Sequence, residues 1–280
     1  MRRAFPALLA LVGIFGWGPI AGAHEGAIET PAPLTEIGRA SVFTFRGPLD
    51  PTRWVVVQQP GAGKYATFPE LQYYMPDSVT VEHGILHIDA RNVRQIDPVD
   101  GEDYAYTSGR VESARSFLYG RLEVRAKMPI GDGFWPAIWL QTPERAGPIS
   151  GQIDIFDGFG SHTNGFESSL TTWSRGRLIS RTCVLVERLD LKNGCRHVGN
   201  PLRYRYNFAS NFHTFGIDWA PDHVIWLVDG KPYWTVTDDV PHVPMVLVLD
   251  LAVGGAQDGY PPRKTNFPGA FEIVSVTLTR

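Results

Sequence analysis

The chain has 280 residues, of which 43% are hydrophobic and 20% are charged, an ordinary composition for a soluble globular protein with a sizeable core. The formal net charge is −3 and Lys and Arg form no long block, so the composition argues against nucleic acid as a partner. Aromatic residues make up 12% of the chain, including 8 Trp. Such rings serve core packing and also offer flat apolar faces to sugars.

The N-terminus has the pattern of a secretory signal peptide. Arg2 and Arg3 supply the positive charge, residues 4–20 are mostly apolar, and Ala21-Gly22-Ala23 forms a small-residue cleavage site. We predict that residues 1–23 are removed and that the mature protein is secreted or periplasmic, with no membrane association after cleavage. An uncleaved anchor is the alternative, but prolines and glycines interrupt an apolar run that is short for a bilayer span.

The rest of the chain predicts many short β-strands. Residues 24–38 form a polar lead-in that we expect to be flexible, and residues 39–280 contain no linker and are expected to form a single domain. No helical periodicity longer than about ten residues is present, which together with frequent turn residues predicts an all-β fold, a two-sheet β-sandwich or jelly roll. Strands or hairpins are expected at 79–88, 120–128, 224–236, 245–253 and 271–278, and irregular stretches at 91–106 and 175–208.

The two cysteines lie twelve residues apart, Cys183 and Cys195, on either side of a Lys192-Asn193-Gly194 turn signal. In an exported protein this spacing favours a disulfide that closes a short local loop. Two free thiols are the alternative. A metal site is not favoured, because His197 alone does not complete a ligand set.

One stretch carries candidate chemistry: Gly151-Gln152-Ile153-Asp154-Ile155-Phe156-Asp157-Gly158. In a regular strand Gln152 and Asp154 share a face while Asp157 points away, and a β-bulge would return Asp157 to the face of the other two. Retaining cleavage of a glycosidic bond uses two carboxyl groups about 5–5.5 Å apart, one as nucleophile and one as acid/base. A third carboxylate between them can help to separate their pKa values.

The chain resembles glycoside hydrolase family 16, the group of laminarinases, lichenases, agarases and transglycosylases. The motif strand is similar to the catalytic strand of the family, and further segments match in the family's order from near residue 40 to near the C-terminus. The resemblance implies a concave jelly-roll sheet with an open cleft that binds a long polysaccharide. The matching segments are residues 106–113, 119–127, 133–140, 212–219, 228–230 and 249–255.

By this resemblance, two of the three working positions of the motif are altered. Gln152 stands where the family has its Glu nucleophile, Asp157 stands where it has its Glu acid/base, and only Asp154 is retained. A neutral amide cannot form the covalent glycosyl intermediate, and loss of a nucleophile typically costs several orders of magnitude in rate. An Asp acid/base still works in principle but reaches less far than Glu.

Catalysis could be retained in two ways, one that uses a neighbouring segment and one that uses the motif alone. Glu167, Ser169 and Thr171 share a face by strand alternation. If that face is the cleft, Glu167 is a candidate to replace the missing nucleophile, whereas the alternative is an edge Glu or an ion pair. A second rescue uses Asp154 as the nucleophile with Asp157 as the acid.

The resemblance also suggests residues that contact the sugar. Trp135 and Trp139 are expected to line the cleft, although Trp139 in the core is the alternative. Arg110 stands where the family often places a sugar-contacting polar residue, and a surface strand Arg is the alternative. Phe159 and Trp173 are further candidates for aromatic platforms.

No metal and no cofactor is predicted. Thr44, Arg46 and Val274 occupy positions at which many family members carry acidic residues for a structural calcium, and calcium prefers several oxygen ligands that include carboxylates. The expected partner is a polysaccharide, a β-glucan or related glycan, bound by a monomer. The favoured function is glycan binding with weak or lost hydrolysis. An active endo-β-glycanase or transglycosylase is the alternative, and a fold kept only for protein assembly is the third hypothesis.

Overall fold

The computed structural model describes residues 41–62, 69–143, 150–174, 176–185, 206–259, 261 and 265–280. The predicted signal peptide and lead-in therefore lie outside the described residues, as does Cys195. No helix in the described part of the chain is long and apolar enough to cross a bilayer.

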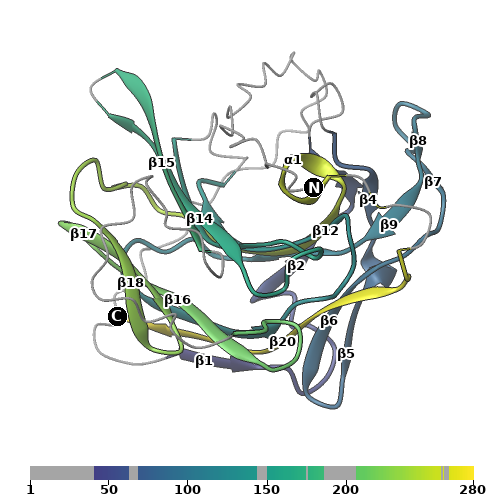
Figure 1. The fold of residues 1–280 in the computed structure, drawn as a ribbon, viewed down its shortest axis with the longest axis horizontal. Helices are drawn as coiled ribbons and strands as arrows, with labels where there is room; N and C mark the ends of the chain where they lie inside the picture. The colour runs from purple at the N-terminus through teal and green to yellow at the C-terminus, as the bar shows by residue number, and fades with distance from the viewer. Residues whose placement is uncertain are drawn as a thin grey trace, which may run out of the picture.

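Two large antiparallel sheets form the molecule, and Figure 1 shows them as two layers. The first, the seven-stranded sheet, contains the motif strand near its middle. Its strands in spatial order are β15 (Arg177–Leu185), β14 (Phe166–Ser174), β13 (Gly151–Gly158), β12 (Phe134–Gln141), β19 (Val246–Val253), β10 (Arg110–Ser113) and β2 (Trp54–Val56).

The second sheet has eight strands and packs against one face of the first. Its order is β18 (Lys231–Val236), β17 (His223–Val228), β16 (His213–Ala220), β11 (Gly120–Lys127), β20 (Gly269–Thr279), β6 (Ile85–Ala90) and β5 (Val79–Glu82), and β1 (Ser41–Thr44) also pairs with β20. The smaller elements are a sheet of β3 (Gln59–Pro60), β4 (Gln72–Tyr74) and β9 (Tyr106–Ser108), the pair β7 (Gln95–Ile96) and β8 (Asp103–Tyr104), the 3₁₀ turn η1 (Pro76–Ser78) and the helix α1 (Gly255–Asp258).

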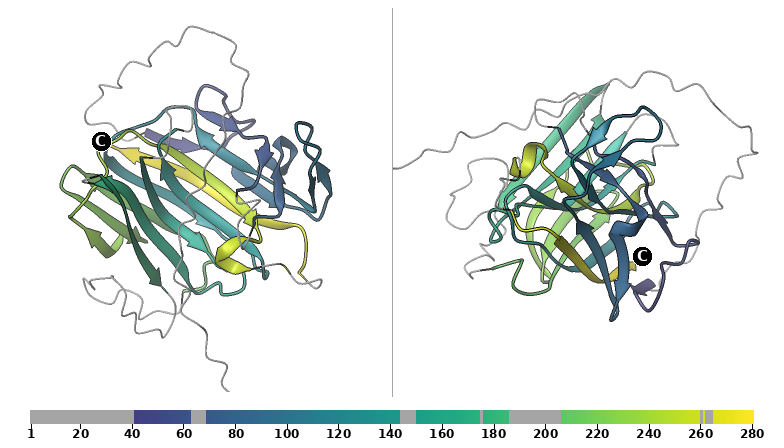
Figure 2. Two further views of the ribbon diagram at one scale, coloured as in Figure 1. Left: turned by 90° about the horizontal axis from the view of Figure 1, so that it is seen from above. Right: turned by 90° about the vertical axis from the view of Figure 1, so that its right-hand side faces the viewer.

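The core lies between the two sheets and fixes the motif strand. Phe156 of β13 is fully buried, and its ring centroid lies 4.2 Å from that of Phe215 on β16 and 5.0 Å from that of Phe166 on β14. The other face of the seven-stranded sheet, called the outer face below, is turned away from the second sheet. α1 lies on that side (Figures 1 and 2).

The predicted all-β sandwich is confirmed, and the hairpins form where turn residues predicted them. His83 and Gly84 have φ of 52° and 81°, and Asp229 and Gly230 have φ of 49° and 72°, the left-handed values that tight hairpin turns require. A strand forms within 245–253 as predicted, and every residue of β19 is buried.

The expectation of irregular structure over 175–208 is wrong for its first part, because β15 extends from Arg177 to Leu185. This strand is at the edge of its sheet and carries polar residues on both faces, so its sequence lacks the apolar alternation of a half-buried strand. Arg181, for example, forms an ion pair of 2.9 Å with Asp239. Within 91–106, β7 and β8 form a short hairpin.

Candidate active site

The motif strand contains the β-bulge that its spacing predicted. The pairing of β13 with both neighbouring strands shifts between Asp154 and Asp157. Ile155 and Phe156 both point into the core at this bulge, with exposed fractions of 1% and 0%. Because the strand gains one residue here, Asp157 returns to the outer face on which Gln152 and Asp154 lie.

The register of the sheet arranges the outer-face side chains in rows that cross several strands. The row that contains Asp157 is acidic at three of its five positions. Between its acids stands Ala137, which has a small side chain and is buried. From β14 to β10, this row is Glu167, Asp157, Ala137, Asp250 and Arg110. The next row between the same strands is Ser169, Asp154, Trp139, Val248 and Glu112. A third row, from β14 to β19, is Thr171, Gln152, Gln141 and Val246.

Asp154 is held from both sides at the centre of the motif. The Gln152 side-chain amide donates a hydrogen bond of 2.8 Å from Nε2 to Asp154 Oδ1, and the Ser169 hydroxyl donates to Oδ2. Burial raises the pKa of Asp154 to about 6, although both of these hydrogen bonds lower it. The amide at position 152 is therefore tied to a carboxylate rather than pointing freely from the sheet.

Asp157 is buried beside a tryptophan and a second carboxylate. Trp135 donates from its indole Nε1 to Asp157 Oδ1 over 3.0 Å, and Asp157 is only 8% exposed. Burial and the charges of Asp154 and Glu167 raise the pKa of Asp157 well above its ordinary value. Burial and the charge of Asp154 also raise the pKa of Glu167 to about 7. Both groups thus have the raised pKa that an acid catalyst needs near neutral pH.

Glu167 lies on the outer face, as strand alternation predicted if that face carried the site. Its position in the register is opposite Asp157, whereas the partner of Gln152 is Thr171. The structure therefore places Glu167 beside Asp157 and not beside Gln152. This register disfavours the expectation that Glu167 replaces a nucleophile at position 152.

A polar network beside the motif strand, on the same outer face, holds Trp139 in its orientation. The indole Nε1 of Trp139 donates to Asp250 Oδ1 over 2.7 Å, Tyr74 donates its hydroxyl to Asp250 Oδ2 over 2.8 Å, and the Arg110 guanidinium lies 5.2 Å from the Trp139 ring centroid. Arg110 also pairs with Glu112 at 2.6 Å. Trp139 and Arg110 are thus on the outer face and not in the core.

Sequence reasoning missed two acids of this network, Asp250 and Glu70. Burial and the charge of Asp250 raise the pKa of Glu70 to about 7, and the Gln72 amide donates to Glu70 over 2.7 Å. Asp250 had a detectable signal, because it is the one charged residue in the apolar run 245–253. Glu70 precedes a short strand, and nothing in its local sequence marks it.

The two remaining aromatic candidates lie at opposite ends of the face. Phe159 is half-buried and directly follows β13, beyond the level of Asp157. Trp173 is 55% exposed and lies on β14 six residues from Glu167, which corresponds to about 20 Å along a strand. The structure does not gather Trp173 with the motif. Only a long polymer chain could contact both Trp173 and the motif residues.

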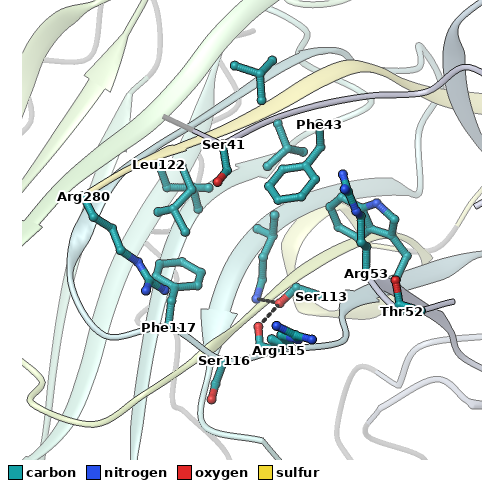
Figure 3. Close-up of a pocket in the computed structure, with 15 residues that line it drawn as sticks. Ser41, Phe43, Thr52, Arg53, Ser113, Arg115, Ser116, Phe117, Leu122 and Arg280 are labelled. Carbon is teal, nitrogen blue, oxygen red and sulfur yellow. Dashed lines mark hydrogen bonds between the residues drawn. The ribbon is translucent and has the colours of Figure 1, made fainter. Parts of the chain in front are cut away.

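Among the described residues, no group of three or more His, Cys, Asp or Glu side chains could hold a metal ion. A cavity of about 570 Å³ opens between the sheets near β1 and β2, and Figure 3 shows Phe43, Arg53, Phe117 and Arg280 around it. None of the motif residues lines it.

Cys183 is buried, and its predicted disulfide with Cys195 stays a prediction.

Comparisons with known proteins place this geometry in a family. The model of the family described as "Glycosyl hydrolases family 16" matches residues 72–268. A β-glucanase from Rhodothermus marinus is 29% identical over 274 residues, covering 89% of this chain and 86% of the relative. A β-1,3-glucan-binding protein from Penaeus monodon is 29% identical over 189 residues, covering 55% of this chain and 48% of the relative.

A solved structure agrees with the fold. The laminarinase catalytic domain from Thermotoga maritima superimposes with a TM-score of 0.69 at 29% identity, covering 87% of this chain and 98% of that domain. This chain spans about a third to a half of the length of several other curated relatives that it matches. The family match covers more than half of the chain, and the chain belongs to glycoside hydrolase family 16.

Proposed function

We propose that this protein binds a β-linked glucan along the outer face of the seven-stranded sheet and hydrolyses it weakly or not at all. The observation that carries the proposal is the amide of Gln152, which stands at the family's nucleophile position and donates a hydrogen bond to Asp154. An amide in this place cannot form and release the glycosyl ester of a retaining mechanism.

The binding half of the proposal is supported by side chains that remain in place. Trp135 and Trp139 lie two rows apart on β12 with Ala137 between them, and each indole is oriented by a carboxylate, Asp157 or Asp250. Rigid aromatic rings with satisfied N–H groups present an apolar face to a sugar at low entropic cost. The names of the relatives, a β-glucanase and a β-1,3-glucan-binding protein, support a β-glucan as the ligand.

An active endo-β-glycanase or transglycosylase is the second candidate, and one observation favours it. Asp157 and Glu167 face each other with raised pKa values, so the acid half of the reaction has suitable groups. In this alternative Asp157 acts with Glu167 or with Asp154. What this candidate lacks is an anionic group at position 152.

The substitution Gln152→Glu tests the main proposal. We expect the wild-type protein to bind insoluble β-1,3-glucan without releasing reducing ends, and the variant to gain hydrolysis by about 100-fold or more, because a nucleophile typically contributes several orders of magnitude. The measurement is reducing-end release from β-1,3-glucan, together with co-sedimentation for binding.

Gln95→Glu is the matched control, since it makes the same chemical change on β7, away from the motif. It should bind glucan as the wild type does and gain no hydrolysis. Wild-type turnover at a rate normal for endo-glycanases would overturn the claim of weak or lost hydrolysis. Failure of the wild type to bind any β-glucan would overturn the claim of glycan binding.

A further inference from the structure

Glu167 and Asp157 are cross-strand neighbours on the outer face. They stand directly opposite in the register of β14 and β13, and side chains in such a position have Cβ atoms about 4.5–5.5 Å apart. Glu167 is one methylene longer and is half-buried, whereas Asp157 is 8% exposed. Of the two carboxyl groups, Glu167 therefore has the longer side chain and the greater exposure.

Asp157 is directed towards β12. The indole N–H of Trp135 donates to its Oδ1 atom, which orients the shorter side chain along the sheet surface. At the family's acid/base position a Glu would have the length to reach above the sheet, and Asp157 has lost that length. The carboxyl group that restores the reach at this point of the face belongs to the neighbouring strand.

The surroundings of Glu167 suit a group that keeps a proton near neutral pH. Asp154 and Asp157 face it from β13, Asp250 lies farther along the same row, and the Gln257 side chain approaches from α1. Burial and the charge of Asp154 raise its pKa to about 7, and Gln257 lowers it. Carboxylates placed this closely do not all ionise together, so the Asp157–Glu167 pair retains a proton under neutral conditions.

We propose that Glu167, and not Asp157, is the group at this site that can donate a proton to a glycosidic oxygen, so that β14 keeps the acid function although position 152 is Gln. In the variant Gln152→Glu, the Glu167 proton passes to the glycosidic oxygen as the bond from that oxygen to the anomeric carbon breaks. The freed sugar leaves as an alcohol, and the anomeric carbon bonds to the carboxylate oxygen.

The second half of the step reverses these roles. Glu167, now ionised, takes a proton from water while the water oxygen attacks the anomeric carbon and the ester bond breaks. Both carboxyl groups return to their starting states. This inference rests on the proposed function, because it assigns the acid half of a site whose nucleophile position is Gln152.

The test compares Glu167→Gln and Asp157→Asn in the Gln152→Glu background. The substrates are two aryl β-glycosides of one β-1,3-linked oligosaccharide, a dinitrophenyl glycoside that needs no protonation of its leaving group and a phenyl glycoside that does. Glu167→Gln should slow the phenyl substrate about 10²–10⁴-fold, the usual contribution of a general acid. It should leave bond cleavage in the dinitrophenyl substrate nearly unchanged and remove the alkaline limb of the pH profile for the phenyl substrate.

Asp157→Asn should slow both substrates by less than Glu167→Gln slows the phenyl one, and it should retain the alkaline limb. Glu123→Gln, on β11 of the other sheet, is the matched control and should behave as its parent. If Asp157→Asn shows the leaving-group dependence and Glu167→Gln does not, the inference is wrong while a gain in Gln152→Glu still supports the proposed function.

The remaining outcomes separate the two claims in the same way. If the wild type itself turns over glycan, the proposed function fails, and Glu167→Gln is then tested with the same two substrates in the wild-type background. If neither the wild type nor Gln152→Glu cleaves any substrate, both the restored hydrolysis and the role of Glu167 as a proton donor are overturned.

Discussion

At the scale of single residues, the outer face depends on indole groups that are held by buried acids. Trp139 donates to Asp250 and carries the Arg110 guanidinium over its ring. Asp250 is 5% exposed, so water does not readily replace a lost donor. The same hydrogen bond therefore orients the Trp139 ring and satisfies the buried Asp250 carboxylate, so that its loss affects both residues.

Trp139→Phe should destabilise the fold by about 1.5–3 kcal/mol, the usual contribution of a hydrogen bond to a charged group. It keeps an aromatic face but removes the indole N–H, and it should also weaken glucan binding because the ring loses its orientation. Urea unfolding measures the first effect and glucan co-sedimentation the second. Trp173→Phe is the same change at a ring that is 55% exposed and should alter stability by less than about 0.5 kcal/mol. Equal stability losses in the two variants would contradict this account.

At the scale of elements, α1 connects the start of β12 to the loop that follows β13. Asp258 at the end of α1 accepts hydrogen bonds from the backbone N–H of Gly133 at 2.8 Å and of Ser161 at 3.0 Å, and from the Ser161 hydroxyl. Trp135 lies two residues after Gly133. One carboxylate thus fixes the end of the outer face where Trp135 and Phe159 lie.

Asp258→Ala should lower stability by about 1.5–3 kcal/mol, because two backbone donors and a hydroxyl lose a charged acceptor. It should also weaken glucan binding several-fold, since the segment that carries Trp135 is no longer fixed. Asp222→Ala, at a side chain that is 84% exposed, is the control and should change neither quantity. Unchanged glucan affinity in Asp258→Ala would show that α1 does not position the binding face.

Local sequence predicted those elements whose cause is local. His83-Gly84 and Asp229-Gly230 favour tight turns on their own, and the spacing of Asp154 and Asp157 already required a bulge. The role of Glu167 could not be assigned in this way, because it depends on which β13 residue stands opposite, and register is set by the whole sheet. Asp250 and Glu70 are 180 residues apart in sequence and become neighbours only through the fold. β15 was missed because an edge strand needs no apolar face.

At the scale of the whole molecule, the outer face and the polar network around Asp250 concentrate acids whose ionised forms the fold disfavours. The pKa of Asp154 is raised to about 6, and those of Glu167 and Glu70 are raised to about 7. Acids with raised pKa values mean that the folded state binds more protons than the unfolded state between about pH 4 and pH 7. These groups therefore lower the free energy of unfolding as pH rises through this window, and their effect is constant above it.

Removing one such acid should reduce this pH dependence. We expect Glu167→Gln to be more stable than the wild type at pH 8, by about 1 kcal/mol or roughly 2–4 °C in Tm. The difference should shrink as pH falls towards 4, where Glu167 is protonated in both states. Thermal unfolding from pH 4 to pH 8.5 measures it, with Glu82→Gln, an exposed residue at the end of β5, as the matched control. A Glu167→Gln variant that is less stable than the wild type at pH 8 would show that the ionised carboxylate is stabilised at this site, and the site would then not suit a proton donor.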